Sequence, residues 1–338
     1  MTEKGRKFLS GAIRTILKLA VAAAVMIWFC RSFDFNAVAA FSSFNYFLLI
    51  PAFFILIFTN IAASLRWRAL ADTINVDLTP FRAFSLTMQG LFFSLVIPGG
   101  SIGGDVVKMA AITGHVKQGS RTEGIFSIVM DRIVGMIALF ALALALLIIN
   151  RSLFAELKFD DTTIPMAGTL LWWIFTGTCS AGLLVALVIF IHRLIEKLPG
   201  IKQLMSFADQ KSNGKITRLS NAADSYASSG RKITFWVVIT IFFIHLTPAL
   251  SMFLLLYGTG AVQGFSAVVP AVIIGNIAGL VPLFPGGIGA RDTVTIALLA
   301  AAGCPVQHAA AAQLLSTAVM ILFNLTGSLF FIFDRKTS

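Results

Sequence analysis

The feature that most constrains this chain is a series of apolar runs, many of them about 20 residues long, which is the length of a membrane-spanning helix. Hydrophobic residues make up 57% of the 338 residues and charged residues only 12%, and the mean hydropathy is +0.89. A soluble domain could not bury that much apolar surface. The runs do not alternate as barrel strands would, so we predict an all-α polytopic membrane protein. The runs lie near residues 10–30, 46–65, 83–97, 125–149, 169–192, 233–257, 265–284 and 308–333.

The charge of the chain is strongly positive. Lys and Arg number 26 against 15 acidic residues, a formal net charge of +11. In a soluble protein such an excess would suggest a nucleic-acid partner, but cytoplasmic loops of membrane proteins collect basic residues. We therefore expect a multi-pass protein of the cell (inner or cytoplasmic) membrane, with no nucleic-acid partner. The basic start and long first apolar run favour an uncleaved first helix over a signal peptide.

The positions of the basic residues test how many runs cross the bilayer. The basic N-terminus should be cytoplasmic, and after two crossings the loop 66–82 returns to the cytoplasm with Arg66 and Arg68. If 83–97 also crossed, the basic connector 193–232 would lie outside the cell, against the positive-inside rule. If 83–97 instead turns at Pro98-Gly99-Gly100 and leaves on the same side, the connector lies inside.

The same reasoning applies to 265–284, which we expect to enter from outside and to turn at Pro285-Gly286-Gly287. The predicted topology has about six full transmembrane helices and two re-entrant helical hairpins, with both termini in the cytoplasm. Superposing the two Pro-Gly-Gly motifs aligns the flanking helices as well, with opposite orientation. We therefore predict one membrane domain, 1–338, built as an inverted repeat with halves 1–150 and 169–338.

The connector 193–232 has no counterpart in the first half. Its sequence fits an amphipathic helix on the anionic inner leaflet and equally a solvated linker.

Broken backbone at membrane depth is tolerated only against protein or a water-filled cavity, so two facing breaks predict a polar cavity. Free amides after each glycine turn would attract an anion there. Charged residues cluster at the same depth, and intramembrane charges are functional candidates by default. Structural ion pairs are the alternative, for instance Asp131 with Arg132 or Lys108. The candidate substrate-binding residues are Gly99, Gly100, Gly103, Gly104, Asp105, Lys108, Asp131, Arg132, Gly286, Gly287, Gly289, Arg291 and Asp292.

Catalytic and metal motifs do not emerge from the sequence. The stretch "PGGSIGGD" lacks the βαβ context of a dinucleotide site and the Gly-Lys-Ser/Thr of a P-loop. We predict no catalytic residue, no metal ligand and no cofactor. Cys30, Cys179 and Cys304 lie in apolar segments without metal-ligand spacing, so we interpret them as packing residues.

Three motifs together resemble the lysylphosphatidylglycerol synthase transmembrane-region family of flippase-like membrane proteins. They are Pro-Gly-Gly-x-x-Gly-Gly-Asp with Lys108 three residues on, Asp131-Arg132 early in the next helix, and the late "PLFPGGIG" that begins at Pro282. The resemblance covers essentially the whole chain. It implies movement of a lipid with a polar or charged headgroup between leaflets.

Two departures from the family pattern bear on the headgroup. Lys108 stands where arginine is common, and Asp292 stands near the second turn where glutamate is common. The family includes the membrane half of the bacterial multiple peptide resistance factor, whose soluble aminoacyl-transferase domain we do not expect here. An enzyme is therefore not predicted, although the family name refers to a lysyltransferase.

Our leading hypothesis is a flippase for an anionic, aminoacylated or glycosylated lipid. An ion-coupled carrier of a small solute and a membrane-embedded lipid-modifying enzyme using Asp105 and Asp131 are the alternatives. The expected partners are the bilayer and a polar-headgroup lipid, with a second copy of the chain or a lipid-synthesis enzyme as further candidates.

Overall fold

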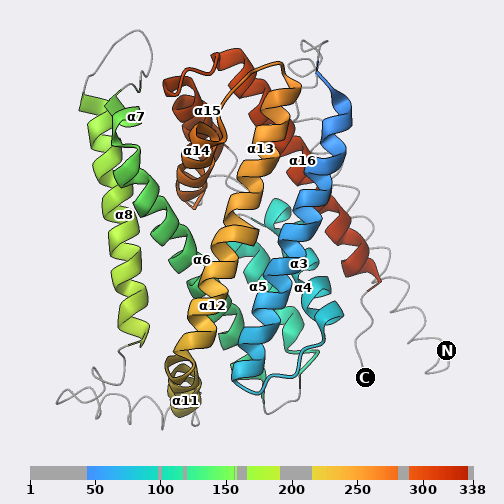
Figure 1. Cartoon of the computed structure of the whole chain (residues 1–338). Coiled ribbons are helices and arrows are strands. Elements are labelled where there is room, and N and C mark those ends of the chain that lie inside the picture. Colours follow the sequence, from blue (N-terminus) through green and yellow to red (C-terminus); the bar gives the residue numbers. More distant parts are fainter. Residues whose placement is uncertain are drawn as a thin grey trace.

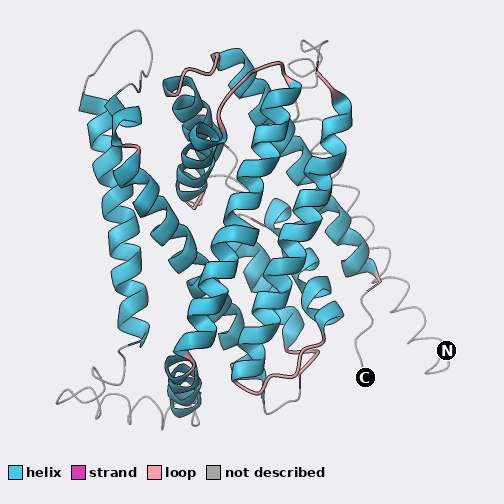
Figure 2. Cartoon of the chain, viewed as in Figure 1, coloured by secondary structure: helices cyan, strands magenta, loops and turns pink. Residues whose placement is uncertain are grey.

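The computed structural model describes residues 44–97, 101–116, 120–155, 157, 166–190, 215–280 and 289–333. All regular structure in these residues is helical, as predicted (Figure 2). The helices are η1 (Tyr46–Leu48), α3 (Leu49–Thr73), α4 (Pro80–Val96), α5 (Ser101–Ile112), α6 (Arg121–Ile149), α7 (Arg151–Ala155), α8 (Met166–Phe190), α11 (Lys215–Ser228), α12 (Gly230–Thr240), the π-helix η3 (Ile241–His245), α13 (Leu246–Gly258), α14 (Phe265–Ala278), α15 (Ala290–Ala301) and α16 (Val306–Ile332).

Five helical stretches in the described residues are long and apolar enough to cross a membrane. They correspond to five of the six predicted spans, and the sixth, near 10–30, lies outside the described residues. The chain is therefore a multi-pass α-helical membrane protein. The five stretches are Tyr46–Thr73, Arg121–Ile149, Gly168–Leu187, Gly230–Gly258 and Val306–Ile332.

Two pairs of shorter helices accompany the spans. The first pair is α4 and α5, and the second is α14 and α15. At 1.5 Å per residue, α5 and α15 are each about 18 Å long, well short of the roughly 30 Å hydrocarbon core. Figure 1 shows the first pair in the lower half of the molecule and the second pair in the upper half.

Local sequence explains where the short helices begin. Thr79 caps α4 by accepting a hydrogen bond from the Arg82 amide at 3.3 Å, and Pro80 occupies the first helical position, where no amide bond is lost. Gly289 precedes α15 with φ of 94°, a backbone region that strongly favours glycine. Gly289, the last glycine of "PGGIG", thus sets the start of α15.

Equivalent helices of the two halves make equivalent contacts. The long helix α12–η3–α13 takes the place of α3, and α14, α15 and α16 take the places of α4, α5 and α6. Within each half, consecutive elements pack on one another. Across the halves, α4 packs on α16 just as α14 packs on α6, and α3 packs on α13. One short helix of each half, α4 or α14, is thus held against the last long helix of the other half.

Part of the connector 193–232 is a helix, α11, that docks on the bundle. Ala222 and Tyr226 of α11 are buried, and the Tyr226 hydroxyl donates to the Leu70 carbonyl at 2.9 Å. Burial raises the pKa of the Tyr226 phenol. The contacts of α11 therefore run to α3, α6 and α8 of the protein itself, which the linker interpretation did not anticipate.

Three predicted boundaries were wrong. The helix predicted at 46–65 continues to Thr73, so the loop expected at 66–82 is reduced to 74–79. Residues 52–79 contain no glycine or proline that would end the helix earlier, and Asn75 with φ of 57° makes the turn. The helix α14 begins at Phe265 as predicted and ends at Ala278, and the helix expected from 233 begins at Gly230, inside the predicted connector.

Candidate functional site

Arg66 and Asp131 form a buried ion pair between α3 and α6. The Arg66 Nε donates to Asp131 Oδ1 at 2.8 Å, and its Nη1 donates to the Thr240 hydroxyl of α12 at 3.0 Å. Both side chains of the pair are about nine-tenths buried. One arginine thus joins three membrane-spanning helices. The structural pairing that we considered for Asp131 exists, but its partner is Arg66 and not Arg132 or Lys108.

The neighbouring Arg132 pairs with Asp105 of α5. Its Nη2 donates to Asp105 Oδ1 at 2.9 Å, and its Nε donates to Oδ2 of the same carboxylate. The two parallel bonds fix the guanidinium plane relative to α5. Unlike Arg66, the Arg132 side chain is 48% exposed, whereas that of Asp105 is 14% exposed.

Lys108 lies one turn after Asp105 and is buried. Its ammonium stands over the ring of Trp67, 3.6 Å from the centroid, in a cation–π contact. The Trp67 indole in turn donates to the Ser127 hydroxyl of α6 at 3.0 Å. The charges of Asp131 and Asp105 also act on Lys108, so it belongs to the same group of charges.

Glycines bring the charged face of α5 close to α4. A Cβ on Gly104 would collide with the carbonyl oxygen of Gly90, so the two backbones touch at this point. A Cβ on Gly103 would lie 2.8 Å from the Cβ of Ile97. Gly103 and Gly104, which we listed as candidate substrate-binding residues, therefore let α5 pack closely on the end of α4. This packing places α5 where Asp105 reaches Arg132 of α6.

The second short pair carries a matching polar group. The Arg291 Nε donates to Asp292 Oδ1 at 2.8 Å, and its Nη2 donates to the Thr317 hydroxyl of α16 at 2.7 Å. Gln313 of α16 donates to the same Asp292 oxygen at 2.8 Å. The other carboxylate oxygen of Asp292 caps α15 by accepting from the Gly289 amide at 3.5 Å.

The predicted site residues thus divide into two groups. Asp105, Lys108, Asp131 and Arg132 meet around α5 and α6, while Gly289, Arg291 and Asp292 meet at the start of α15. Gly99, Gly100, Gly286 and Gly287 lie outside the described residues. Sequence reasoning missed Arg66, Trp67 and Thr240 as members of the first group. The uninterrupted helical pattern through "SLRWRAL" was the signal that could have placed Arg66 and Trp67 inside the membrane.

A π-helix lies beside the first group. It spans Ile241–His245, directly after Thr240, and the His245 Nε2 lies 3.1 Å from the Gly135 carbonyl oxygen of α6. The wider turn leaves both Thr240 and His245 in contact with neighbouring helices. Such insertions are found frequently at functional sites.

Comparison with known proteins agrees with this architecture. A family model described as the lysylphosphatidylglycerol synthase transmembrane region matches residues 15–327. The chain belongs to that family. Among curated proteins, none matches the chain.

The charges of the first group do not cancel. Arg66, Arg132 and Lys108 face two carboxylates, Asp105 and Asp131, which leaves one net positive charge. In a low-dielectric environment, an unbalanced positive charge attracts an anionic group much more strongly than it would in water. Arginine is also suited to bidentate contact with a phosphate.

Proposed function

We propose that this member of the lysylphosphatidylglycerol synthase transmembrane-region family is a flippase. It moves a lipid with an anionic, aminoacylated or glycosylated headgroup between the leaflets, and a separate enzyme makes the headgroup. The observation that carries the proposal is the exposure of Arg132, a charged side chain deep in a membrane-spanning helix.

The depth of Arg132 follows from helix geometry. It lies 11 residues after the first residue of α6, or about 16 Å along an axis that must cross roughly 30 Å of hydrocarbon. Exposing an arginine to lipid tails near the bilayer centre costs about 3 kcal/mol or more. A half-exposed arginine at this depth therefore favours an opening to water or to a headgroup, with Asp105 fixing its orientation.

The repeated contacts of the two halves support a mechanism. We propose that they form an inverted repeat in which α4–α5 and α14–α15 are re-entrant hairpins from opposite faces. Rocking one half against the other would expose the polar groups to each leaflet in turn. The headgroup would pass along these groups while its acyl chains stay in the bilayer, which avoids the cost of taking a charge through hydrocarbon.

Reconstitution of the purified protein into liposomes tests the site. The probe is phosphatidylglycerol labelled on its headgroup with a fluorophore that a membrane-impermeant reductant quenches. We expect Arg132→Gln and Asp105→Asn to slow the transbilayer movement of the probe at least about tenfold, a loss of roughly 1.4 kcal/mol. Arg151→Gln is the matched control, because Arg151 is exposed in α7, outside both polar groups. Movement at the wild-type rate in Arg132→Gln would exclude this site from the path.

A further inference from the structure

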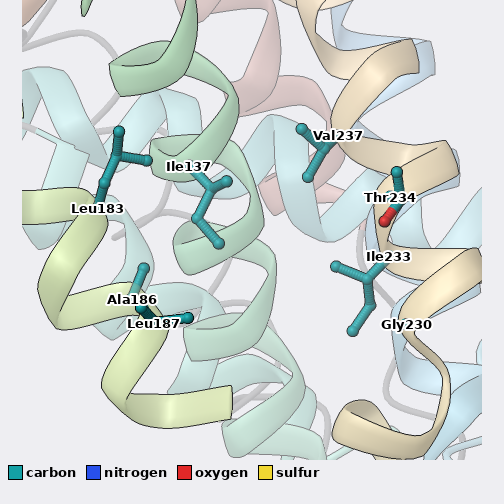
Figure 3. Close-up of a pocket in the computed structure, with 8 residues that line it drawn as sticks. All are labelled: Ile137, Leu183, Ala186, Leu187, Gly230, Ile233, Thr234 and Val237. Atoms are coloured by element: carbon teal, nitrogen blue, oxygen red, sulfur yellow. The ribbon is translucent and has the colours of Figure 1, made fainter. Parts of the chain in front are cut away.

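An apolar groove runs along α6 between α8 and α12, and no residue of either polar group lines it. Its volume is about 350 Å³. Figure 3 shows side chains from the three helices converging on it, and all but one of the lining side chains are apolar. They include Ile137 of α6, Leu183 and Leu187 of α8, and Ile233, Thr234 and Val237 of α12.

The size of the groove limits what can occupy it. One turn of an α-helix, about 10 Å across and 5.4 Å high, fills roughly 420 Å³. The groove is smaller than that, so it cannot enclose the full cross-section of a further transmembrane helix. Because α6, α8 and the helix that α12 begins are membrane spans, the apolar molecule available at this depth is lipid. A single acyl chain is thin enough to enter.

Charge distinguishes one end of the groove. Gly230 lines it at the first turn of α12, and the exposed residues Arg231 and Lys232 follow directly. Val237 lies seven residues further along the helix, or about 10 Å into the bilayer. The groove therefore has a basic residue at one end and an apolar interior. A phospholipid has the same arrangement, with its phosphate at one end and its acyl chains beyond it. The positive-inside rule assigns the basic end to the cytoplasmic leaflet.

We propose that this groove binds one acyl chain of an anionic phospholipid of the cytoplasmic leaflet, with its phosphate against Arg231, which flanks the lined face of α12. The site requires only that the protein spans the membrane, and it does not depend on transport. A basic residue at the membrane surface attracts anionic headgroups, so Arg231 should select anionic over zwitterionic lipid.

Photo-crosslinking tests the proposal with the whole protein in vesicles. The probe is phosphatidylglycerol with a diazirine in one acyl chain, and labelled peptides are mapped by mass spectrometry. We expect labels at 183–187 and 233–237. Leu187→Trp, which fills the groove, should lower labelling at 233–237 about tenfold. Leu184→Trp is the matched control, because Leu184 is 63% exposed and does not line the groove.

A second comparison tests the headgroup. Replacing Arg231 by Gln should remove the preference for labelled phosphatidylglycerol over labelled phosphatidylcholine while leaving some chain labelling. Labels spread evenly over lipid-facing residues and unchanged by Leu187→Trp would mean bulk lipid only and would overturn the proposal. Lipid labels that fall on residues 193–214 and spare 183–187 and 233–237 would overturn it as well.

These outcomes are separable from those of the transport assay. Groove labelling that persists in a protein without flippase activity supports the lipid site and counts against the proposed function. Absence of preferential groove labelling in a wild-type protein that transports lipid counts against the groove site and leaves the proposed function standing.

Discussion

The two arginines of the first group, Arg66 and Arg132, differ in their partners and in their exposure. Arg66 is buried, pairs with Asp131 and reaches Thr240, so it links three helices. Arg132 is half exposed while its carboxylate partner is mostly covered. We therefore assign Arg66 and Asp131 to the stability of the bundle, and Arg132 to contact with the headgroup.

Replacing one partner of the buried Arg66–Asp131 pair should destabilise the protein much more than replacing both. Arg66→Met or Asp131→Leu alone leaves an uncompensated charge and should lower the free energy of unfolding by about 3–5 kcal/mol. The double variant should recover most of that loss. Unfolding in detergent micelles, followed by circular dichroism, measures all three. Additive losses in the double variant would show that the two side chains do not act as a pair.

The sequence identified most of these residues but not their partners. Asp105 and Asp131 were conspicuous because charge at membrane depth is rare. Their partners Arg132 and Arg66 are 27 and 65 residues away, on other helices, and no sequence spacing encodes such a contact. Arg66 was missed because a basic residue after an apolar run was taken for the start of a cytoplasmic loop. Its charge is instead satisfied by Asp131 inside the bundle.

At the scale of elements, close backbone contact holds each short pair together. Gly104 of α5 touches the carbonyl oxygen of Gly90 in α4, and Gly275 of α14 lies against the Thr295 hydroxyl and the Arg291 carbonyl oxygen of α15. In both pairs a missing side chain lets the helices approach. The charged residues that follow are thereby fixed in position relative to α6 and α16.

Adding one methyl group at these contacts should separate the helices. Gly104→Ala and Gly275→Ala should each destabilise the protein by about 1–3 kcal/mol, because the new Cβ has no room. Gly177→Ala in α8 is the control. A Cβ there meets nothing within 4 Å, so the variant should be unchanged or up to about 1 kcal/mol more stable. Thermal unfolding in detergent compares them. Equal melting temperatures for all three would contradict tight packing of the pairs.

The apolar runs predicted the existence and type of the elements well, and their ends poorly. Run length and glycine-proline breaks distinguish long helices from short ones, and the five described spans follow from them. Helix ends depend on contacts that the runs do not contain. Examples are the capping of α15 by Asp292 and the docking of α11 through Tyr226.

At the scale of the whole molecule, the order of long and short helices and their mutual contacts repeat between the halves. An inverted repeat requires α4–α5 and α14–α15 to enter from opposite faces. Figure 1 shows these pairs at opposite ends of the bundle, with α11 at the same end as the first pair.

Cysteine accessibility tests this topology in a background without Cys30, Cys179 and Cys304. Single cysteines at Thr113 and Asn221 should react with a membrane-impermeant maleimide only from the cytoplasmic side. A cysteine at Val262, which is highly exposed, should react from the outside. Labelling of position 113 from outside would mean that α4 crosses the bilayer and that the first hairpin does not exist.

The central claim is that the protein moves lipid, and the most direct measurement compares lipids with a soluble solute in one preparation. Liposomes carrying the wild-type protein are supplied in turn with headgroup-labelled anionic, aminoacylated and glycosylated lipids, and with water-soluble headgroup analogues that lack acyl chains. We predict that at least one lipid crosses the bilayer faster than in protein-free liposomes and that no tail-less analogue is taken up. Uptake of an analogue with no acceleration of any lipid would contradict the account and identify a solute carrier.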